Sequence, residues 1–574
     1  MHGAALLHGW SGLLWGFAAV QGPLLAGLWR GRAPVRSWLA APLVAAPVTM
    51  AAGLGMAALA PWLQGLGAGA GSVLQLASGA TLAALFGYGT GRAMARSAAA
   101  GSLAGWRRGA LVAEPPSHAA RYASGAVRGR TGGAGRGVSL AGLPVPFADE
   151  SKHFKFIGTT GTGKSTAIGE LLSAALARGD RAVIADPDGG YLQRFYDRRR
   201  GDVILNPFDA RSHKWDLFGE LANDYDVEQL ARSLIPDHEG ADRSWRAYAR
   251  TFFSAVTAQA RAAGSHEVSE LYRLLVVAGT AELKTLVAGT PAQPFLEEHN
   301  GRMFDSIRSV TSSAVSALDY VARQHSAPLA VRSWVRGGHS PNGARGVLFL
   351  PYRAGQIAAL RSSISAWMRL AIFETMNREE GGAPLWFVVD ELDALGQIDG
   401  LKDALARLRK FGGRCVLGLQ SIAQVSSTYG SGEAHTLVEN CGNTLILRCS
   451  ASEHGGTSQF ASRLIGEREV THVTRSSSRR GLELRPSLTR TEHLGVEAAV
   501  MGSQIEQLPD LAGYLKLASN PAWLRVSLPA PVSGPRRPDP APTHGARVLQ
   551  FRRWREPAAP PAQQQAGLEG LERE

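Results

Sequence analysis

Cysteine is scarce in this chain of 574 residues, which has only Cys415, Cys441 and Cys449. They form no C-x-x-C pair, and no histidine stands at metal-ligand spacing from them, so the sequence suggests neither a disulfide framework nor a zinc site. Lysine is missing from the first 150 residues, which hold eleven arginines against three acidic residues. This part therefore carries +8 of the formal net charge of +13.

Charge itself is absent from Ser37 to Gly91, a run of 55 residues rich in Leu, Ala, Val and Gly. About 20 apolar residues cross a bilayer as a helix. The run therefore predicts two membrane helices, at 39–62 and 72–91, with a third candidate at 4–28. Arginines flank the pair on both sides, which predicts that both flanks face the cytoplasm. Residues 1–91 are expected to be a multi-pass membrane anchor in contact with lipid; the alternative is a buried helical hairpin of a soluble protein.

Two further segments have compositions typical of poorly ordered chain. Residues 92–146 are rich in Arg, Gly, Ala and Pro, which predicts a flexible basic linker. Its arginines either contact anionic lipid or nucleic acid, or only fix the membrane topology. Residues 529–574 are rich in Pro, Ala and Arg, which predicts a disordered tail.

The stretch "HFKFIGTTGTGKST" contains a complete G-x-x-x-x-G-K-S phosphate-loop motif between a short apolar segment and a helical pattern. Backbone N–H groups of such a loop surround phosphates, Lys164 reaches the β and γ phosphates, and Ser165 binds Mg²⁺. ATP and Mg²⁺ are the expected cofactors. The expected nucleotide-binding residues are Gly158, Thr159, Thr160, Gly161, Thr162, Gly163, Lys164, Ser165 and Thr166.

Downstream, "LWFVV" predicts a buried strand that ends at Asp390 and Glu391. A carboxylate at this place holds the Mg²⁺ shell while its neighbour orients water against the γ-phosphate. Asp390 is thus the expected metal ligand and Glu391 the expected catalytic base. Asp186 ends another predicted strand, where a role in the turn and a direct catalytic role are both open.

The next predicted strand, "RCVLGLQ", ends in Gln420. A polar side chain at this place in ring ATPases reports on the γ-phosphate. Four basic residues precede or begin the strand, and one of them could serve a neighbouring subunit as an arginine finger. They are Arg407, Arg409, Lys410 and Arg414.

Together, the charge-free hairpin, the GTTGTGKST loop, "DPDGG", "VVDEL" and "GLQS" resemble the TraD/TrwB-type coupling proteins of conjugation and type IV secretion. This group is similar to the FtsK/HerA ring motors. The resemblance implies an α/β, RecA-like phosphate-loop domain over 147–211 and 336–528, interrupted by an all-α insertion at 212–335. It implies a hexameric ATPase in the bacterial inner membrane, with its ATPase domain in the cytoplasm. The implied partners are relaxase proteins, DNA and the channel of a type IV secretion system.

The resemblance also assigns roles to individual residues. It makes Arg409 the arginine finger and Gln420 the sensor, both counted with Lys164 and Glu391 as catalytic, and it places Trp245 beside the nucleotide. A basic loop at 475–490 is a candidate for contact with DNA phosphates, although a solvated surface run reads the same way. Two alternatives remain open: an FtsK-like chromosome translocase, and a docking platform that binds nucleotide without motor activity.

Overall fold

The computed structural model describes residues 106–113, 137–237, 242–337, 346–452, 456–478 and 487–530, together with isolated residues between 17 and 89. Most residues of the expected membrane helices at 4–28, 39–62 and 72–91 lie outside this part, and the tail after 530 lies outside it completely. Within the described part, no helix is both long and apolar enough to cross a membrane.

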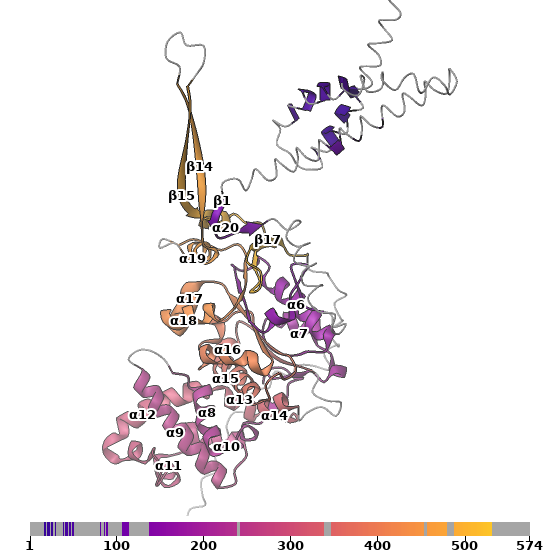
Figure 1. Cartoon of the computed structure of the whole chain (residues 1–574). Coiled ribbons are helices and arrows are strands. Elements are labelled where there is room, and N and C mark those ends of the chain that lie inside the picture. The colour runs from indigo at the N-terminus through magenta and orange to yellow at the C-terminus, as the bar shows by residue number, and fades with distance from the viewer. Residues whose placement is uncertain are drawn as a thin grey trace, which may run out of the picture.

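A ten-stranded mixed sheet forms the centre of the molecule (Figure 1). Seven neighbouring strands, from β13 to β7, are parallel, and β16 and β17 extend the sheet through antiparallel pairs. In spatial order the strands are β2 (Val112–Ala113), β17 (Trp523–Ser527), β16 (Ala512–Lys516), β13 (Asn443–Ile446), β5 (Phe154–Ile157), β12 (Gly413–Leu419), β11 (Leu385–Val389), β6 (Arg181–Pro187), β10 (Val347–Tyr352) and β7 (Val203–Ile204).

Both faces of the sheet are buried, which explains why its central strands are almost continuously apolar. In β11, Trp386 and Val388 pack on the face covered by α6 (Lys164–Arg178) and α7 (Gly190–Phe195). Phe387 and Val389 pack on the other face, under five further helices of the domain. These are α15 (Ile357–Met376), α16 (Leu401–Leu408), α17 (Ile422–Tyr429), α18 (Ser431–Glu439) and α19 (Gly456–Ile465).

Apart from two short strands, the elements that the structure describes between β7 and β10 are all helices, and they lie at one end of the molecule (Figure 1). The chain enters it through β8 (Lys214–Trp215) and returns through β9 (Pro328–Leu329), and these two strands pair in parallel. Its helices are α8 (Asp224–Leu234), α9 (Arg243–Ala262), α10 (Val268–Tyr272), α11 (Thr280–Leu286), α12 (Gly301–Ala314), α13 (Ala317–Ala322) and α14 (Val331–Arg336).

Buried Glu220 fixes the junction between the sheet and this helical insertion. Its Oε1 accepts hydrogen bonds from Trp215 Nε1 over 2.9 Å and from the backbone N of Val331 over 2.6 Å. Its Oε2 accepts one from the backbone N of Arg332 over 3.0 Å. One side chain therefore joins the entering segment to the first turn of α14.

A two-stranded ribbon extends away from the main body, at the end opposite the helical insertion (Figure 1). It consists of β14 (Glu467–Ser478) and β15 (Ser487–Ala498), with twelve cross-strand residue pairs, and β1 (Trp106–Gly109) pairs with the base of β14. Both ends of the expected basic loop at 475–490 are thus strand, while its centre, 479–486, lies outside the described residues. Long antiparallel pairing overrides the loop-like Ser and Arg composition.

The expectation of a flexible linker over 92–146 is likewise wrong in part. Besides β1 and β2, this range contains the small hairpin of β3 (Ser139–Leu140) and β4 (Leu143–Pro144). Its final residues, Val138, Leu140 and Val145, are buried in the core beside α6. The few apolar residues of a segment otherwise rich in Arg and Gly decide its placement, because they bury apolar area against the sheet domain.

Candidate active site

The phosphate-loop motif forms the turn between β5 and α6, because its glycines adopt backbone conformations that other residues resist. Gly161 and Gly163 have φ of 79° and 118°. A Cβ on Gly163 would lie 2.9 Å from Leu511 Cδ2, and one on Gly158 would lie 2.9 Å from Leu447 Cβ. The loop thus needs glycine both for its left-handed backbone and for its close packing. It leads directly into a 15-residue helix, so its backbone N–H groups lie at the N-terminus of that helix.

Lys164 lies folded against its own loop. Its Nζ donates to the carbonyl oxygens of Gly158, over 2.6 Å, and Thr159, over 3.2 Å. Burial lowers the pKa of this ammonium, and the nearby carboxylates of Asp390 and Glu391 act in the opposite direction. A phosphate group would attract this cation more strongly than two neutral carbonyls do.

Asp390 ends β11 directly opposite the start of α6. Its Oδ2 accepts hydrogen bonds from Ser165 Oγ over 2.7 Å and from the Tyr191 hydroxyl over 2.8 Å. Its Oδ1 is buried and has no hydrogen-bond partner among the described residues. Mg²⁺ prefers oxygen ligands and is usually held by one or two carboxylates together with phosphate oxygens. A carboxylate oxygen without a partner beside a serine hydroxyl therefore fits a magnesium ion.

Glu391 and Gln420 meet because β11 and β12 are parallel neighbours that end at the same edge of the sheet. Gln420 Nε2 donates to Glu391 Oε1 over 2.5 Å, and Thr160 Oγ1 donates to Gln420 Oε1 over 3.3 Å. Burial raises the pKa of Glu391, helped by the charges of Asp390 and Asp393. The arrangement links the phosphate loop to the expected base through one amide.

Asp186, whose role the sequence left open, is completely buried and holds the start of α7. Its carboxylate accepts hydrogen bonds from the backbone N of Tyr191 over 3.1 Å and of Leu192 over 2.7 Å. Burial raises the pKa of Asp186 to about 7. The geometry supports the turn-forming role and brings in Tyr191, which the sequence analysis did not single out. An acidic strand end followed within five residues by a helix with an aromatic residue was the available signal.

The basic residues around β12 are not near the phosphate loop of their own chain. Arg409 is exposed and lies in the short helix η8 (Arg409–Phe411), before β12 begins, and its charge lowers the pKa of His153 before β5. It is therefore at the amino edge of the sheet, opposite the candidate site. Arg414 is buried, pairs with Glu150 over 3.1 Å and lies over the Phe147 ring, so it belongs to the fold. Arg407 and Lys410 are exposed beside Arg409.

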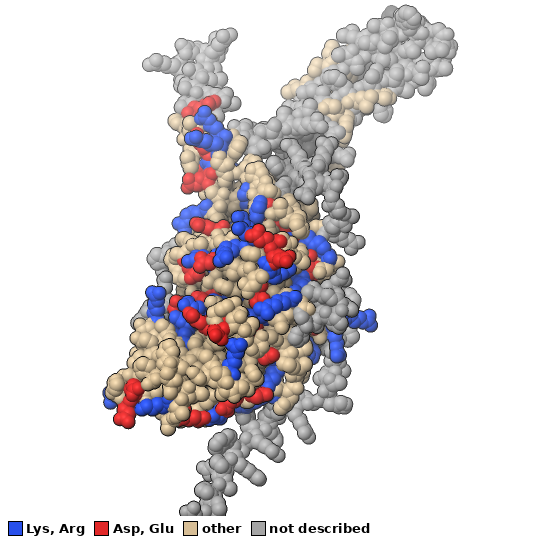
Figure 2. Space-filling model, turned by 60° about the horizontal axis from the view of Figure 1, so that its bottom comes forward, with Lys and Arg blue, Asp and Glu red and all other residues tan. Residues whose placement is uncertain are grey.

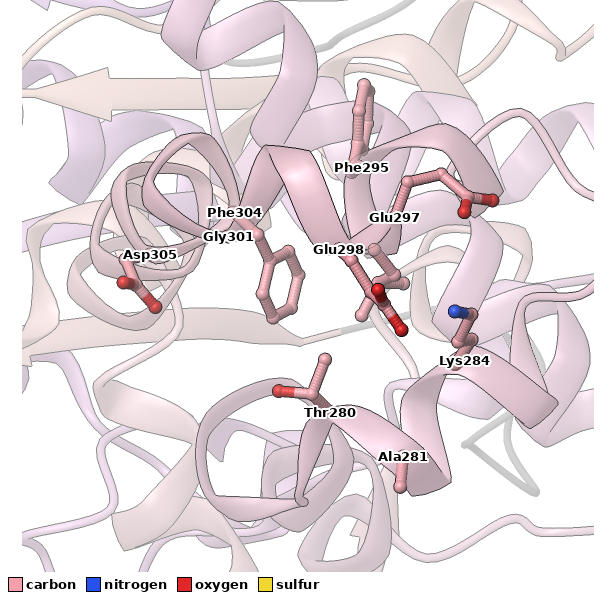
Figure 3. Close-up of a pocket in the computed structure, with 10 residues that line it drawn as sticks. Thr280, Ala281, Lys284, Phe295, Glu297, Glu298, Gly301, Phe304 and Asp305 are labelled. Atoms are coloured by element: carbon pink, nitrogen blue, oxygen red, sulfur yellow. The ribbon is translucent and has the colours of Figure 1, made fainter.

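Trp245 lies in the helical insertion, where its ring packs edge-on against Tyr248 at 6.0 Å between centroids. In Figure 1 its helix, α9, lies with the other helices of the insertion, below α6, and the ring contact described for Trp245 stays within α9. The expectation that this ring lies beside the nucleotide stays a prediction. The insertion also contains a cavity of about 280 Å³, in which Phe304 faces Thr280 and Glu298 (Figure 3). All residues that line it lie between 280 and 305, so it is separate from the phosphate loop.

Charges of both signs are mixed over the face of the molecule shown in Figure 2. On this face, and among the side chains that the structure describes, no continuous basic band is visible that would mark a nucleic-acid track.

Comparison with known proteins adds a family to this geometry. Residues 137–529 match the family model of the type IV secretion-system coupling protein DNA-binding domain. The chain is 31% identical over 394 residues to the coupling protein TraD of Escherichia coli strain K12, a match covering 68% of this chain and 54% of TraD. The match thus spans about half the length of that relative.

Solved structures of the conjugative coupling protein TrwB are also similar. An unbound form of TrwBdeltaN70 has a TM-score of 0.64 and 31% identity, covering 74% of this chain and 93% of that one. TrwB in complex with the ATP analogue ADPNP has a TM-score of 0.62 and 31% identity, covering 74% and 94%. TrwB in complex with ADP and Mg²⁺ has a TM-score of 0.63 and 30% identity, covering 75% and 97%.

Proposed function

Because the chain belongs to the family of type IV secretion-system coupling proteins, we propose that it is an ATPase that couples ATP hydrolysis to the movement of DNA, or of a relaxase–DNA complex, into a conjugation channel. The observation that carries the proposal is the meeting of Lys164, Ser165, Asp390, Glu391 and Gln420 at one edge of the sheet. TrwB, which shares the fold, has been crystallised with ADPNP and with ADP and Mg²⁺. This supports ATP and Mg²⁺ as the ligands of the present site.

In this mechanism the loop N–H groups and Lys164 would bind the β and γ phosphates, and Ser165 and Asp390 would hold the metal. Magnesium would supply positive charge that neutralises the charge developing on the phosphate oxygens. Glu391 orients a water molecule for in-line attack on the γ phosphorus and accepts its proton, and Gln420 holds the Glu391 carboxylate in place. The P–O bond to the β-phosphate breaks, and ADP leaves with that oxygen.

A ring of identical subunits is part of the proposal. Arg409 is exposed at the edge of the sheet opposite its own phosphate loop, so it serves as a finger only if it enters the site of a neighbouring subunit. Residues 1–91 anchor the ring in the inner membrane and leave the ATPase domain in the cytoplasm, on the grounds of the charge-free run and its arginine flanks. Lipid, relaxase proteins and channel components are the remaining proposed partners.

The test is ATP hydrolysis by the full chain in lipid nanodiscs, with and without single-stranded or double-stranded DNA. We expect DNA to stimulate hydrolysis, and Lys164→Ala and Glu391→Gln to abolish it, while Glu380→Gln at an exposed position leaves it unchanged. Arg409→Ala should abolish hydrolysis yet retain nucleotide binding. When Arg409→Ala subunits are mixed with wild-type subunits, the fractional loss in the rate of ATP hydrolysis should exceed the fraction of variant subunits.

Two results would count against the motor. A rate of ATP hydrolysis that changes neither on addition of DNA nor in the Arg409→Ala variant would contradict a DNA-stimulated ring motor. Transfer of a marked plasmid by the Lys164→Ala variant would favour a docking platform that does not use ATP. Activity confined to chromosome handling, with plasmid transfer intact in a strain that lacks the gene, would favour an FtsK-like translocase.

A further inference from the structure

Tyr191 makes a contact with the candidate metal ligand that the proposed mechanism does not use. Its hydroxyl donates to Asp390 Oδ2 over 2.8 Å, from a side chain that is 6% exposed. The ring comes from α7, which packs on the same face of the sheet as α6. The hydroxyl thus reaches Asp390 from a different element than the phosphate loop does.

Hydrogen bonds hold the backbone of Tyr191 as well as its hydroxyl. The Asp186 carboxylate binds the backbone N–H groups of Tyr191 and Leu192, and the turn before them has left-handed backbone at Asp188 and Gly189, with φ of 58° and 73°. The Leu192 side chain is buried in the core. Rotation of the tyrosine away from Asp390 would leave a buried carboxylate short of one donor, which is costly.

The two donors to Asp390 differ in their freedom. Ser165 belongs to the phosphate loop, and its hydroxyl has lone pairs for a metal as well as one proton for Asp390. Tyr191 belongs to neither nucleotide motif and makes the same type of bond to the same oxygen. With Oδ2 occupied by both donors, Oδ1 is the oxygen left without a partner.

We propose that Tyr191 is a positioning residue: it holds the Asp390 carboxylate in the one orientation in which Oδ1 is presented to magnesium. The proposal rests on the assignment of this site as a magnesium–nucleotide site. It assigns to "DPDGGY" a purpose beyond a turn, because Asp186 holds the helix start that aims Tyr191. Groups that orient a metal ligand typically contribute about 10-fold to 100-fold to metal affinity.

The experiment uses the full chain in nanodiscs and measures binding of a fluorescent ADP analogue at increasing Mg²⁺, and in EDTA. Tyr191→Phe keeps the ring and removes only the hydroxyl. We expect the Mg²⁺ concentration for half-maximal enhancement of binding to rise by about 10-fold or more, with binding in EDTA unchanged. Tyr320→Phe, in the helical insertion, is the control for loss of a phenol and should match wild type.

Equal Mg²⁺ dependence in Tyr191→Phe and wild type would overturn the proposal. A loss of binding by the same factor in EDTA and in Mg²⁺ would also overturn it, since Tyr191 would then support the fold as a whole. The outcome is independent of catalysis: a Tyr191-dependent Mg²⁺ response in a protein that does not hydrolyse ATP would refute the ATPase and leave the positioning role intact.

Discussion

Gln420 holds Glu391 by a hydrogen bond of 2.5 Å from Nε2 to Oε1. The other end of the same amide accepts a hydrogen bond from Thr160, inside the phosphate loop. The two strand ends are 29 positions apart and the phosphate loop is 260 positions before Gln420, and all three are thus joined at the place where the terminal phosphate of a nucleotide would lie. A change in the loop can therefore alter the orientation of the base without any movement of the sheet.

Replacing Gln420 with Ala should separate catalysis from binding. The variant leaves the phosphate loop complete but frees the Glu391 carboxylate to rotate, so we expect kcat for ATP to fall by about 100-fold while KM changes little. Steady-state hydrolysis measures both. The control is Gln397→Ala, which removes an amide that donates to Glu433 over 3.4 Å and that makes no hydrogen bond to the phosphate loop among the described residues. This variant should leave kcat nearly unchanged. A rise in KM without loss of kcat would contradict the assignment.

Gly418 permits the close approach of β12 to the end of β11. A Cβ at this position would lie 1.9 Å from the backbone oxygen of Asp390, so Gly418→Ala must displace the strand end that carries the metal ligand. We expect a loss of about 1–3 kcal/mol in the free energy of unfolding, together with weaker Mg²⁺-dependent nucleotide binding. Gly432→Ala is the matched control, since it lies in helix α18 and its added Cβ would meet no heavy atom within 4 Å beyond its chain neighbours and its own helix backbone. Equal stability of the two variants would refute this account of the packing.

Arg369 links the helical insertion to the segment that follows the candidate site. Its guanidinium donates to Gln229 and Ser233 of α8 and pairs with Asp399 over 3.2 Å, with its side chain 4% exposed. Arg369→Met leaves these acceptors without their donor. We therefore expect the free energy of unfolding, measured in urea, to fall by about 3 kcal/mol. Arg323→Met, which breaks an exposed pair with Asp319, should cost under about 1 kcal/mol. Similar losses in both variants would show that the buried contacts contribute nothing special.

His153 should make stability depend on pH. Its Nε2 donates to the Leu405 carbonyl over 2.9 Å, and its Nδ1 accepts from the Cys415 N–H over 3.1 Å, so the buried ring is neutral. Burial lowers its pKa to about 4, and nearby Arg409 and Arg414 act in the same direction.

The unfolded chain, with a histidine pKa of about 6.5, binds more protons than the native state between pH 4 and 6.5, so stability falls as pH falls through this window. We expect His153 to contribute about 1.4 kcal/mol per pH unit there, measured by urea unfolding at several pH values. His153→Asn, which tolerates the φ of 57°, should lose this part of the slope. An unchanged slope in the variant would show that the ring titrates normally.

The sequence predicts best where a motif and its strand are neighbours along the chain. The phosphate loop after β5, Asp390 and Glu391 after β11, and Gln420 after β12 are all strand-end positions in a sheet whose parallel order brings them to one edge. Tyr191 was missed because its partner Asp390 is 199 positions away, and the acidic strand end before Tyr191 indicates a helix start rather than a contact with a second strand end. The same applies to β16 and β17, since antiparallel extension of a sheet depends on pairing between distant segments. Residues 475–490, at the far end of the ribbon, were expected to form a loop because they are mainly small, polar or basic.

The pairing of β8 with β9 also bears on how such a protein diversifies. The chain leaves the sheet domain at Trp215 and returns at Leu329, and these two residues are paired in adjacent strands. The two ends of the helical insertion therefore lie side by side. Domain exchange is tolerated best where the two ends of the exchanged piece lie close together. Recombination at these two positions could replace the whole helical module while the ten strands and the nucleotide edge keep their order. The nucleotide-binding sheet domain and the helical insertion can therefore have separate evolutionary origins.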